Sequence, residues 1–547
     1  HPGAGAALAR GAVDPGSRGN CIAALNGDID NYQMLRADLL AAGTDIHPDI
    51  TTDAKIVPLL VAHLRRAGLP AHDAFDAMID RAAGSMAIAA LFADRPGEIF
   101  LAQKGSGQGL FVGPADESVA VASEMYGIVE LTDRYVKAEG ELEKNGRPAG
   151  ERFRIDMAGP SIAAVRPEGA AALAKERIRR AEITTRDIDR GAFPRYLLKE
   201  ITESVASVRK TMRGKLRQAG EKRCIHLGDD TVRPECIEAL RSRAIRRIVT
   251  TGQGTAAVAG QGIAYLLNRA LGGAGIAAEA MKATELSGHH LRPDMRDTLV
   301  IAVSQSGTTT DTNRTVDLVK ARGAHVIGIV NRRNSDLVYK SHSVLYTSDG
   351  RDIEMSVAST KAFYAQNVAG QILALALAER LGALPPETLA RELRALEEFP
   401  AAMAATLAAG DAVRDLAYAH APRHRHWAIV GTGPGRIAAD EIRIKLSELC
   451  YKAIAVDFLE DKKHIDLSSE PLVLVCAAGL SAQQVGDAVK EVAIFKAHKS
   501  VPIVITDEGE TRFTPYAAGQ IRVPRHEGGL AYLLPVMVGH LFAFHAA

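Results

Sequence analysis

The stretch "DTLVIAVSQSGTTTDTNRTVDLVKARG" (residues 297–323) joins an apolar run to an amphipathic segment through a loop rich in hydroxyl groups. The apolar run predicts a buried strand, and the spacing after the loop predicts a helix that ends at Gly323. Buried strands alternating with helices form parallel sheets covered on both faces. Ligands of such sheets bind at the carboxyl ends of the strands, where helix N-termini present free N–H groups. The stretch therefore predicts an α/β fold with a ligand loop.

The loop itself has two readings. Gly307 lets the backbone approach a ligand closely, so that the loop could cradle a phosphate without any lysine. The side chains able to donate hydrogen bonds to such an anion are Ser304, Gln305, Ser306, Thr308, Thr309 and Thr310. A Ser/Thr-rich turn also caps helices, with Thr310 or Asp311 as the cap. On residue types alone, the cradle and the cap stand as equal alternatives.

Units of a strand, a loop and a helix occur in two series along the chain. One series contains "RRIVTTGQGTAA", "AHVIGIVN" and "SVLYTSDG", and the later one contains "HWAIVGTGPGR", "PLVLVCAAGLS" and "VPIVITDEG". Each series opens on an apolar strand followed by a G-x-G turn, at residues 252–254 and 431–433. This pattern predicts a duplication, with two doubly wound parallel-sheet domains.

The beginning of the chain has a different pattern. Short strands such as "CIAALNG" alternate with helical segments such as "AKIVPLLVAHLRRAG", which predicts an α+β domain. A highly charged connector with helical spacing follows at residues 184–216. We place the domain boundaries near residues 166 and 395, which gives three domains, 1–165, 166–395 and 396–547.

Composition excludes several classes of function. The 547 residues carry a net charge of +1, so no bulk field attracts nucleic acid or an anionic membrane. The five cysteines are widely spaced, without a CxxC pair, which argues against a zinc site or a disulfide framework. No apolar run approaches the roughly 18 residues of a membrane span. We expect a cytoplasmic protein without a metal or another cofactor.

Two further patterns are ambiguous by themselves. "GQGTA" is not a GxGxxG turn followed by an acidic residue, so a dinucleotide site is not expected. Glu441, Lys445 and Glu448 form a charged stripe at helical spacing. Such a stripe is usually a solvated face stabilised by Glu–Lys pairs, although it could also carry acid–base chemistry. His464, in a loop before an apolar strand, has the same two readings.

Several motifs together resemble one family. "SQSGTTTDT" resembles the sugar-phosphate loop of SIS domains, and "SVASTKAF" (residues 356–363) contains their VASTKAF signature. "GQGTA", the connector "YLLKEI" and the second α/β half agree with this resemblance. "ALNGDIDNY" and "TTDAKIV" resemble segments of class II (Ntn-type) glutamine amidotransferases. In this order, the motifs resemble the glucosamine-6-phosphate synthase family, the glutamine–fructose-6-phosphate aminotransferases.

The resemblance implies a set of site residues. The phosphate ligands would be Ser304, Gln305, Ser306 and Thr309, with Thr255 nearby, and the sugar would be lined by Val357 and Ser359. The catalytic positions of the family fall on Glu441, Lys445, Glu448 and His464. In the amidotransferase part, the oxyanion-hole pair falls on Asn26 and Gly27, and the aspartate that binds the α-amino group of glutamine falls on Asp53.

The implied reaction converts fructose 6-phosphate into glucosamine 6-phosphate with nitrogen from glutamine or ammonia. Opening the sugar ring and moving a proton between C1 and C2 requires acid–base groups near both atoms. His464 is suited to ring opening and Glu448 to proton transfer. Lys445 is suited to stabilising the oxyanion and keeping Glu448 ionised. In the family the histidine comes from the neighbouring subunit, which implies a homodimer.

Some positions depart from the family. Residue 1 is histidine where the family has its nucleophilic cysteine, and Cys21 lies within a predicted strand. The chain also lacks the family's RWATHG-type segment, from which we expect missing sequence upstream of His1, and it ends before the family's C-terminal lysine. Two alternatives follow. One is a sugar-phosphate isomerase or deaminase that does not use glutamine, and the other is a regulator that binds a sugar phosphate without catalysis.

Overall fold

The computed structural model divides into two compact units, one of residues 1–189 with the short segment 308–313, and one of residues 190–307 and 314–547. The structure describes residues 7–8, 21–49, 51–116, 118–158, 161–166, 168–181, 183–219, 222–464 and 470–547.

The first unit is built on a seven-stranded antiparallel sheet with the strand order β1-β2-β3-β4-β10-β11-β12. Its strands are β1 (Ala7–Leu8), β2 (Cys21–Ile29), β3 (Gly84–Phe92), β4 (Glu98–Lys104), β10 (Glu151–Asp156), β11 (Ser161–Arg166) and β12 (Gly169–Ala172). A four-stranded sheet in the order β13-β7-β5-β6 consists of β5 (Phe111–Pro114), β6 (Val119–Ala122), β7 (Arg134–Lys137) and β13 (Arg179–Arg180).

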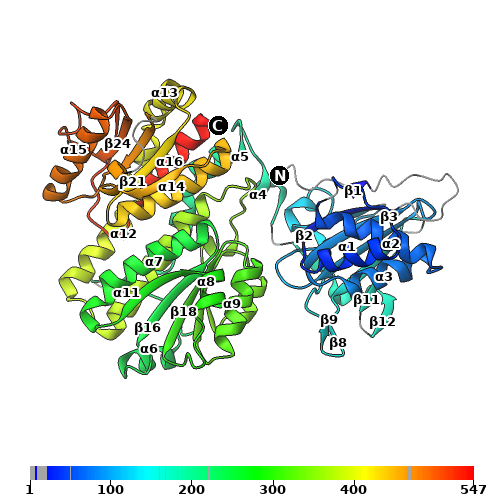
Figure 1. Ribbon diagram of the computed structural model, residues 1–547. Helices are drawn as coiled ribbons and strands as arrows, with labels where there is room; N and C mark the ends of the chain where they lie inside the picture. Colours follow the sequence, from blue (N-terminus) through cyan, green and yellow to red (C-terminus); the bar gives the residue numbers. More distant parts are fainter. Residues whose placement is uncertain are drawn as a thin grey trace. The chain divides into compact units, whose positions relative to one another are not determined.

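Helices and the smaller sheet supply apolar groups for the two faces of the large sheet. The helices are α1 (Tyr32–Ala41), α2 (Ile56–Arg66) and α3 (Ala71–Arg81), seen beside β2 and β3 in Figure 1. Alternation along β4 separates the two cores, because Phe100 packs with the helix residues whereas Leu101 packs with Val112 and Val136 of the smaller sheet. This arrangement confirms the α+β prediction for the beginning of the chain.

The second unit contains two five-stranded sheets, each parallel throughout. The first has the order β17-β16-β18-β19-β20, and the second the order β22-β21-β23-β24-β25. Both orders are 2-1-3-4-5 in chain sequence, which confirms the predicted duplication of a doubly wound fold. The strands are β16 (Arg247–Gly252), β17 (Ala277–Lys282), β18 (Thr298–Ser304), β19 (His325–Val330), β20 (Ser343–Tyr346), β21 (Trp427–Gly431), β22 (Ala455–Phe458), β23 (Leu472–Cys476), β24 (Val501–Asp507) and β25 (Gly519–Val523).

One hydrophobic core joins these two sheets through the helices between them. Figure 1 shows α14 (Pro434–Cys450) beside α16 (Leu533–Ala546), and these helices are in contact. α11 (Lys361–Leu381) is buried along most of its length and α16 along its first eleven residues. The buried stretch of α16 is apolar except for one histidine, whereas that of α11 also contains Lys361, Gln366, Asn367 and Gln371. The other helices of this core are α5 (Tyr196–Met212), α6 (Pro234–Arg241), α7 (Thr255–Leu271), α12 (Pro386–Leu407) and α13 (Gly410–His420).

The outer faces of the two sheets have cores of their own. On the first sheet, apolar side chains of α8 (Ala283–His289), α9 (Thr310–Lys320) and α10 (Asp336–Lys340) pack on the strands. On the second sheet, α15 (Ala482–Ala497) does the same. The remaining short elements are α4 (Thr185–Ile188), β8 (Glu143–Lys144), β9 (Arg147–Pro148), β14 (Leu216–Ala219) and β15 (Lys222–Ile225).

None of the helices in the described ranges combines the length and apolarity that a membrane crossing requires. The predicted connector leads into α5, whose buried stripe packs against α11 and α12. The domain boundaries near residues 166 and 395 stay a prediction.

Candidate active site

The two G-x-G turns have the same local conformation, which places two helix N-termini equivalently in the two halves of the second unit. Gly254 precedes α7 with φ 57° and ψ −131°, and Gly433 precedes α14 with φ 54° and ψ −130°. Both φ values lie in the region that glycine adopts at little cost. α7 therefore begins at Thr255, and α14 carries the charged stripe away from the second turn.

The charged stripe of α14 is largely buried. Glu441 is 0% exposed and Lys445 is 1% exposed, whereas the side chain of Glu448 is 48% exposed. The Nζ atom of Lys445 lies 3.1 Å from Glu448 Oε2 and 3.5 Å from Glu441 Oε1. The alternative of a solvated surface stripe is therefore excluded for Glu441 and Lys445, and a row of charges leads from the interior to the surface.

Thr255 connects the first α/β half to this row. Lys445 Nζ donates a hydrogen bond of 2.8 Å to Thr255 Oγ1, and that hydroxyl in turn donates to Glu441 Oε1 at 3.4 Å. An ammonium group has three protons, and Thr255, Glu448 and Glu441 face all three. Lys445 thus holds the two carboxylates on either side of its ammonium group. A substrate oxygen could bind this ammonium group only by replacing one of the three partners.

Electrostatics keep this lysine charged. Burial by itself lowers the pKa of Lys445, but the neighbouring carboxylates of Glu441 and Glu448 raise it, and the net pKa is above the ordinary value. Lys445 is thus an ammonium ion at neutral pH. A buried ammonium between two carboxylates is an arrangement for charge stabilisation and proton transfer.

The loop after β18 is held by the side chain of Ser304 and by the backbone of Arg332, which follows β19. Gly307 N donates to Ser304 Oγ at 2.9 Å, and Arg332 N donates to the carbonyl oxygen of Gln305 at 3.2 Å. Gly307 has φ 66°, and a Cβ at this position would lie 2.0 Å from Ser335 Oγ. Only glycine fits at this position of the loop.

α9 starts at Thr310, directly after this loop. Asn313 N donates to the carbonyl oxygen of Thr309 at 3.0 Å, so Thr309 holds the cap position that the sequence analysis assigned to Thr310 or Asp311. Ser304, Gln305 and Ser306 are on the strand side of the helix start. Thr309 lies in the segment 308–313 that groups with the first unit.

The "SVASTKAF" segment forms the N-terminus of α11. Glu354 caps this helix, because its Oε1 accepts hydrogen bonds from Thr360 N at 2.8 Å and Ala362 N at 3.1 Å. Ser359 Oγ donates to Glu354 Oε2 at 2.7 Å, while Val357 is 77% exposed. A carboxylate that the sequence analysis did not single out thus orders the residues expected to line a sugar.

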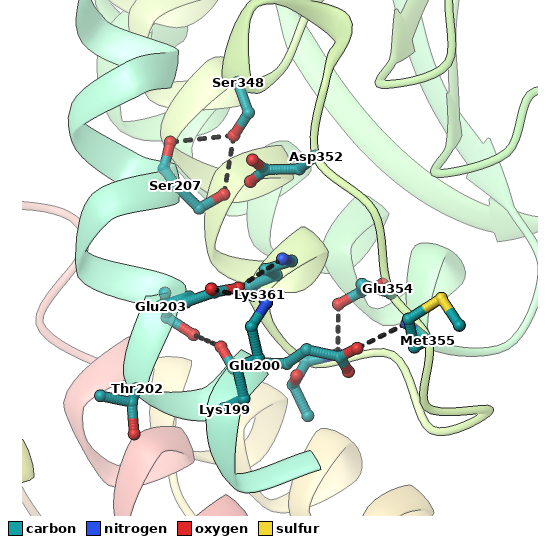
Figure 2. Close-up of polar contacts among 12 residues, drawn as sticks. Lys199, Glu200, Thr202, Glu203, Ser207, Ser348, Asp352, Glu354, Met355 and Lys361 are labelled. Carbon is teal, nitrogen blue, oxygen red and sulfur yellow. Dashed lines mark hydrogen bonds and ion pairs between the residues drawn. The ribbon is translucent and has the colours of Figure 1, made fainter. Parts of the chain in front are cut away.

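A second overlooked carboxylate holds the same segment from α5. Glu200 Oε1 accepts from Met355 N at 2.5 Å and Ser356 N at 3.1 Å, and Ser356 Oγ donates to Glu200 Oε2. Figure 2 shows Glu200 facing Met355. Its only sequence signal was the motif "YLLKEI", which contains this glutamate but assigns it no partner.

Beside Glu200, ion pairs join α5 to the first residue of α11. Glu203 accepts from Lys199 and from Lys361, both at 2.8 Å (Figure 2). Ser207 and Ser348 share a hydrogen bond of 2.7 Å one turn further along α5. The network fixes the "SVASTKAF" segment on a rigid helix, as a binding loop requires.

Glu200 makes stability depend on pH. Burial raises its pKa from 4.5 to about 7, against the opposing hydrogen bond from Ser356, and the Glu354 carboxylate adds to the rise. Between these values the folded chain keeps a proton that the unfolded chain has lost, so the free energy of unfolding falls as pH rises. The full loss is about 3 kcal/mol, at about 1.4 kcal/mol per pKa unit.

Glu200→Gln should remove this loss. Relative to the unchanged chain, we expect the variant to gain about 2 kcal/mol more unfolding free energy at pH 8 than at pH 5. Urea denaturation at both pH values measures the difference, with Glu379→Gln on the exposed end of α11 as the matched control. A gain that is equal at the two pH values would contradict the assignment.

Buried polar atoms without a hydrogen-bond partner in the described part of the chain occur in all four segments of the site. They are Gln253 Oε1, Gln305 Oε1, Thr360 Oγ1 and Glu441 Oε2. Buried polar groups are normally paired, and either a water molecule or a ligand would satisfy these atoms. Further atoms of this kind occur away from the site, such as Thr44 Oγ1 and Ser500 Oγ. Among the described residues, no group of three or more His, Cys, Asp or Glu side chains is arranged to hold a metal ion.

In the first unit, the structure brings together the three residues expected to bind glutamine. Asn26 and Gly27 are adjacent on β2, and Asp53 begins the 3₁₀ turn Asp53–Lys55. Asp53 Oδ2 accepts from Ile29 N at 2.9 Å, which holds the aspartate at the end of β2. Gly27 has φ 114°, and a Cβ there would lie 2.2 Å from Ser85 O, so only glycine fits beside β3.

One expected catalytic residue is placed only by its backbone. His464 ends the 3₁₀ turn Asp461–His464, and its side chain lies outside what the structure describes. The role of His464 in ring opening therefore stays a prediction.

Comparison with known proteins finds a matching domain family in each of the two units. Residues 11–130 match the glutamine amidotransferase domain family, and residues 243–376 match the SIS domain family. Glutamine–fructose-6-phosphate aminotransferase (isomerizing) of Symbiobacterium thermophilum is 27% identical over 95% of this chain and 80% of its own length. The protein of the same name from Mycolicibacterium smegmatis is 29% identical over 91% of this chain and 76% of its own length.

A solved structure has the same fold over the second unit. The C-terminal domain of glucosamine-fructose-6-phosphate aminotransferase from Francisella tularensis covers 65% of this chain and 97% of its own, with a TM-score of 0.56 and 20% identity. An amidotransferase domain thus precedes a SIS domain in one chain, which is similar over nine-tenths of its length to glutamine–fructose-6-phosphate aminotransferases.

Proposed function

We propose that this protein converts fructose 6-phosphate into glucosamine 6-phosphate, with nitrogen from glutamine or from ammonia. The observation that carries the proposal is the charged row of α14. Its buried members, Glu441 and Lys445, are joined to Thr255 of the other α/β half, and Glu448 reaches the surface. Ketose–aldose conversion needs such a row, because a proton moves while charge develops on a neighbouring oxygen.

Each segment of the site has a part in this reaction. Ser304, Gln305 and Ser306 bind the phosphate at the carboxyl end of β18, together with Thr309 and the N-terminus of α9. The segment held by Glu200 and Glu354 binds the sugar through Val357 and Ser359. The amide oxygen of Gln305 and the free oxygen of Glu441 take ligand hydroxyl groups as partners.

Within this site Glu448 transfers the proton between C1 and C2, and His464 opens the ring. Lys445 holds Glu448 in place at 3.1 Å and gives up one partner as charge develops on the substrate oxygen. If His464 acts in a neighbouring subunit, as the resemblance implies, the protein is a homodimer. Its proposed setting is the cytoplasm, where sugar phosphates and glutamine occur together.

When glutamine supplies the nitrogen, the first unit binds it in this proposal, with Asp53 on the α-amino group and Asn26 and Gly27 beside the amide oxygen. The support for this is the fixed position of Asp53 at the end of the strand that carries the other two residues. Because residue 1 of this sequence is histidine and not the family's nucleophilic cysteine, ammonia remains the alternative nitrogen source.

The direct test is incubation with fructose 6-phosphate and either glutamine or an ammonium salt. Glucosamine 6-phosphate, identified by mass spectrometry, is the expected product, and a comparison of the two nitrogen sources shows whether the first unit delivers ammonia. Binding of fructose 6-phosphate is measured in parallel by calorimetry. A protein that binds the sugar but forms no product from either source would contradict the proposal.

A further inference from the structure

The C-terminal helix α16 brings one imidazole to the catalytic row. The helix is apolar along its buried stretch apart from His540, which is 1% exposed. A lone histidine in an apolar helix is costly to bury unless both ring nitrogens have partners. The groups that surround the imidazole of His540 therefore indicate its role.

Close packing between α16 and α14 sets the position of this imidazole. A Cβ at Gly539 would lie 2.3 Å from the Cγ1 atom of Ile442, so only glycine allows the two helices to approach this closely. Gly539 precedes His540 and Ile442 follows Glu441 in sequence. The approach of the helices thus brings the imidazole to the buried carboxylate.

Both ring nitrogens of His540 face polar groups. Nδ1 lies 2.8 Å from the hydroxyl of Tyr364 on α11, which is a hydrogen bond. Nε2 lies 3.5 Å from Glu441 Oε1 and makes no hydrogen bond within the described ranges. Burial lowers the pKa of His540, against the opposing effect of Glu441, so the imidazole is neutral at neutral pH. Burial also raises the pKa of Tyr364, with Glu441 adding to the rise, which keeps its hydroxyl protonated.

The proton positions follow from these partners. An ionised Glu441 can only accept, so the single ring proton of a neutral imidazole belongs on Nε2. Nδ1 then accepts from the Tyr364 hydroxyl, and the Nε2 proton of His540 faces Glu441 Oε1. The contact of 3.5 Å is long, as such contacts often are before a ligand binds.

We propose that His540 is a positioning residue for Glu441, with Tyr364 fixing the tautomer of the imidazole. This role rests on the proposed function of the site. His540, Thr255 and Lys445 all face Oε1 of Glu441, whereas Oε2 has no hydrogen-bond partner within the described ranges. Fixing Oε1 in this way leaves Oε2 directed at the ligand.

The test compares two replacements of His540. In His540→Gln, the side-chain amide can reach the place of Nε2 and still donate to Glu441, whereas His540→Leu fills similar space without a donor. We expect the leucine variant to lose roughly 10- to 100-fold in kcat, since small misplacements of catalytic groups have effects of this size. Its KM for fructose 6-phosphate should stay within about twofold, because a positioning role acts on turnover and not on binding.

His540→Gln should recover most of the lost rate, and Tyr364→Phe should fall between the two. His545→Gln, near the end of the same helix, is the matched control and should leave kcat unchanged. Thermal unfolding of each variant separates a positioning effect from lost folding. A merely structural role would lower the unfolding temperature and kcat of the glutamine and leucine variants alike.

Deuterium incorporation into fructose 6-phosphate from D₂O, followed by NMR, gives a readout that needs no nitrogen donor. If the unchanged protein shows neither product nor exchange, the proposed function fails and this role fails with it. If the unchanged protein turns over and His540→Leu keeps the same kcat, the role of His540 alone is overturned. Equal losses in His540→Gln and His540→Leu would overturn it as well.

Discussion

Glu448→Gln is expected to lower kcat by about 10²- to 10⁴-fold, the range in which positioned acid–base groups contribute. The carboxylate is the one member of the α14 row that reaches the surface, with 48% of its side chain exposed, so it can meet a substrate. Glutamine keeps the length of the side chain and can still accept a hydrogen bond from Lys445. What it cannot do is take up a proton from carbon.

Sugar binding should survive this change. The proposed phosphate ligands lie at the end of β18, and the proposed sugar segment is held by Glu200 and Glu354, none of which depends on the Glu448 charge. Calorimetry with fructose 6-phosphate should therefore give an affinity within about threefold of the unchanged protein, in line with an interaction made mainly in the transition state.

The measurement pairs Glu448→Gln with Glu379→Gln, which makes the same chemical change at an exposed position of α11. Product formation from fructose 6-phosphate and ammonia is followed for both variants. An undiminished rate in Glu448→Gln would remove this residue from the mechanism. A protein that binds the sugar phosphate and shows no turnover in either form would instead be a sensor.

Much of the fold could be predicted because both parallel sheets are built from continuous apolar strands. β16, β18, β19, β21, β23 and β24 are nearly all buried, and such strands read as uninterrupted apolar runs bounded by turns. β17 did not stand out, because it is an alanine-containing edge strand with alternating exposure. Edge strands carry less of the hydrophobic signal than central ones.

The candidate site could be predicted only in part. The spacing of Glu441, Lys445 and Glu448 placed them on one helix, but spacing cannot tell a buried stripe from a solvated one. That difference depends on Thr255, which lies 190 positions before Lys445 and meets it only through the packing of α7 against α14. The family resemblance favoured a functional role for this charged stripe, and the burial of Glu441 and Lys445 agrees with such a role.

Other residues around the site had no usable signal in the sequence. Glu200 meets the "SVASTKAF" segment 156 positions later, and His540 reaches Glu441 because a glycine lets two helices approach. Contacts of this kind follow from tertiary packing, which local patterns of apolar and polar residues do not encode. They are therefore the parts of the site where the structure adds most.

Lys445→Met is expected to reduce the free energy of unfolding by about 3–5 kcal/mol, the usual cost of removing one partner from a buried ion pair. The reason is not the lost lysine but the carboxylate that remains. Glu441 is 0% exposed, and without the ammonium its neighbours are the neutral groups of Thr255 and His540. A buried charge without a counter-ion is among the least favourable features that a folded chain can contain.

The double variant Glu441→Gln/Lys445→Met separates this explanation from simple loss of packing. Once both charges are gone, no ion is left uncompensated, and replacing a buried pair by neutral groups of similar size is often nearly neutral. We expect the double variant to recover at least about half of the stability lost in Lys445→Met, which makes the two changes strongly non-additive.

Urea denaturation of the unchanged protein, both single variants and the double variant at pH 7.5 completes the cycle. Turnover should be lost in both forms that lack Lys445, so that stability and activity separate in the double variant. If Lys445→Met costs less than about 1 kcal/mol, or if the double variant is as unstable as the sum of the singles, the pair does not hold a buried charge. The α14 row would then be a packing feature, because a carboxylate that tolerates the loss of its ammonium partner is already solvated or protonated.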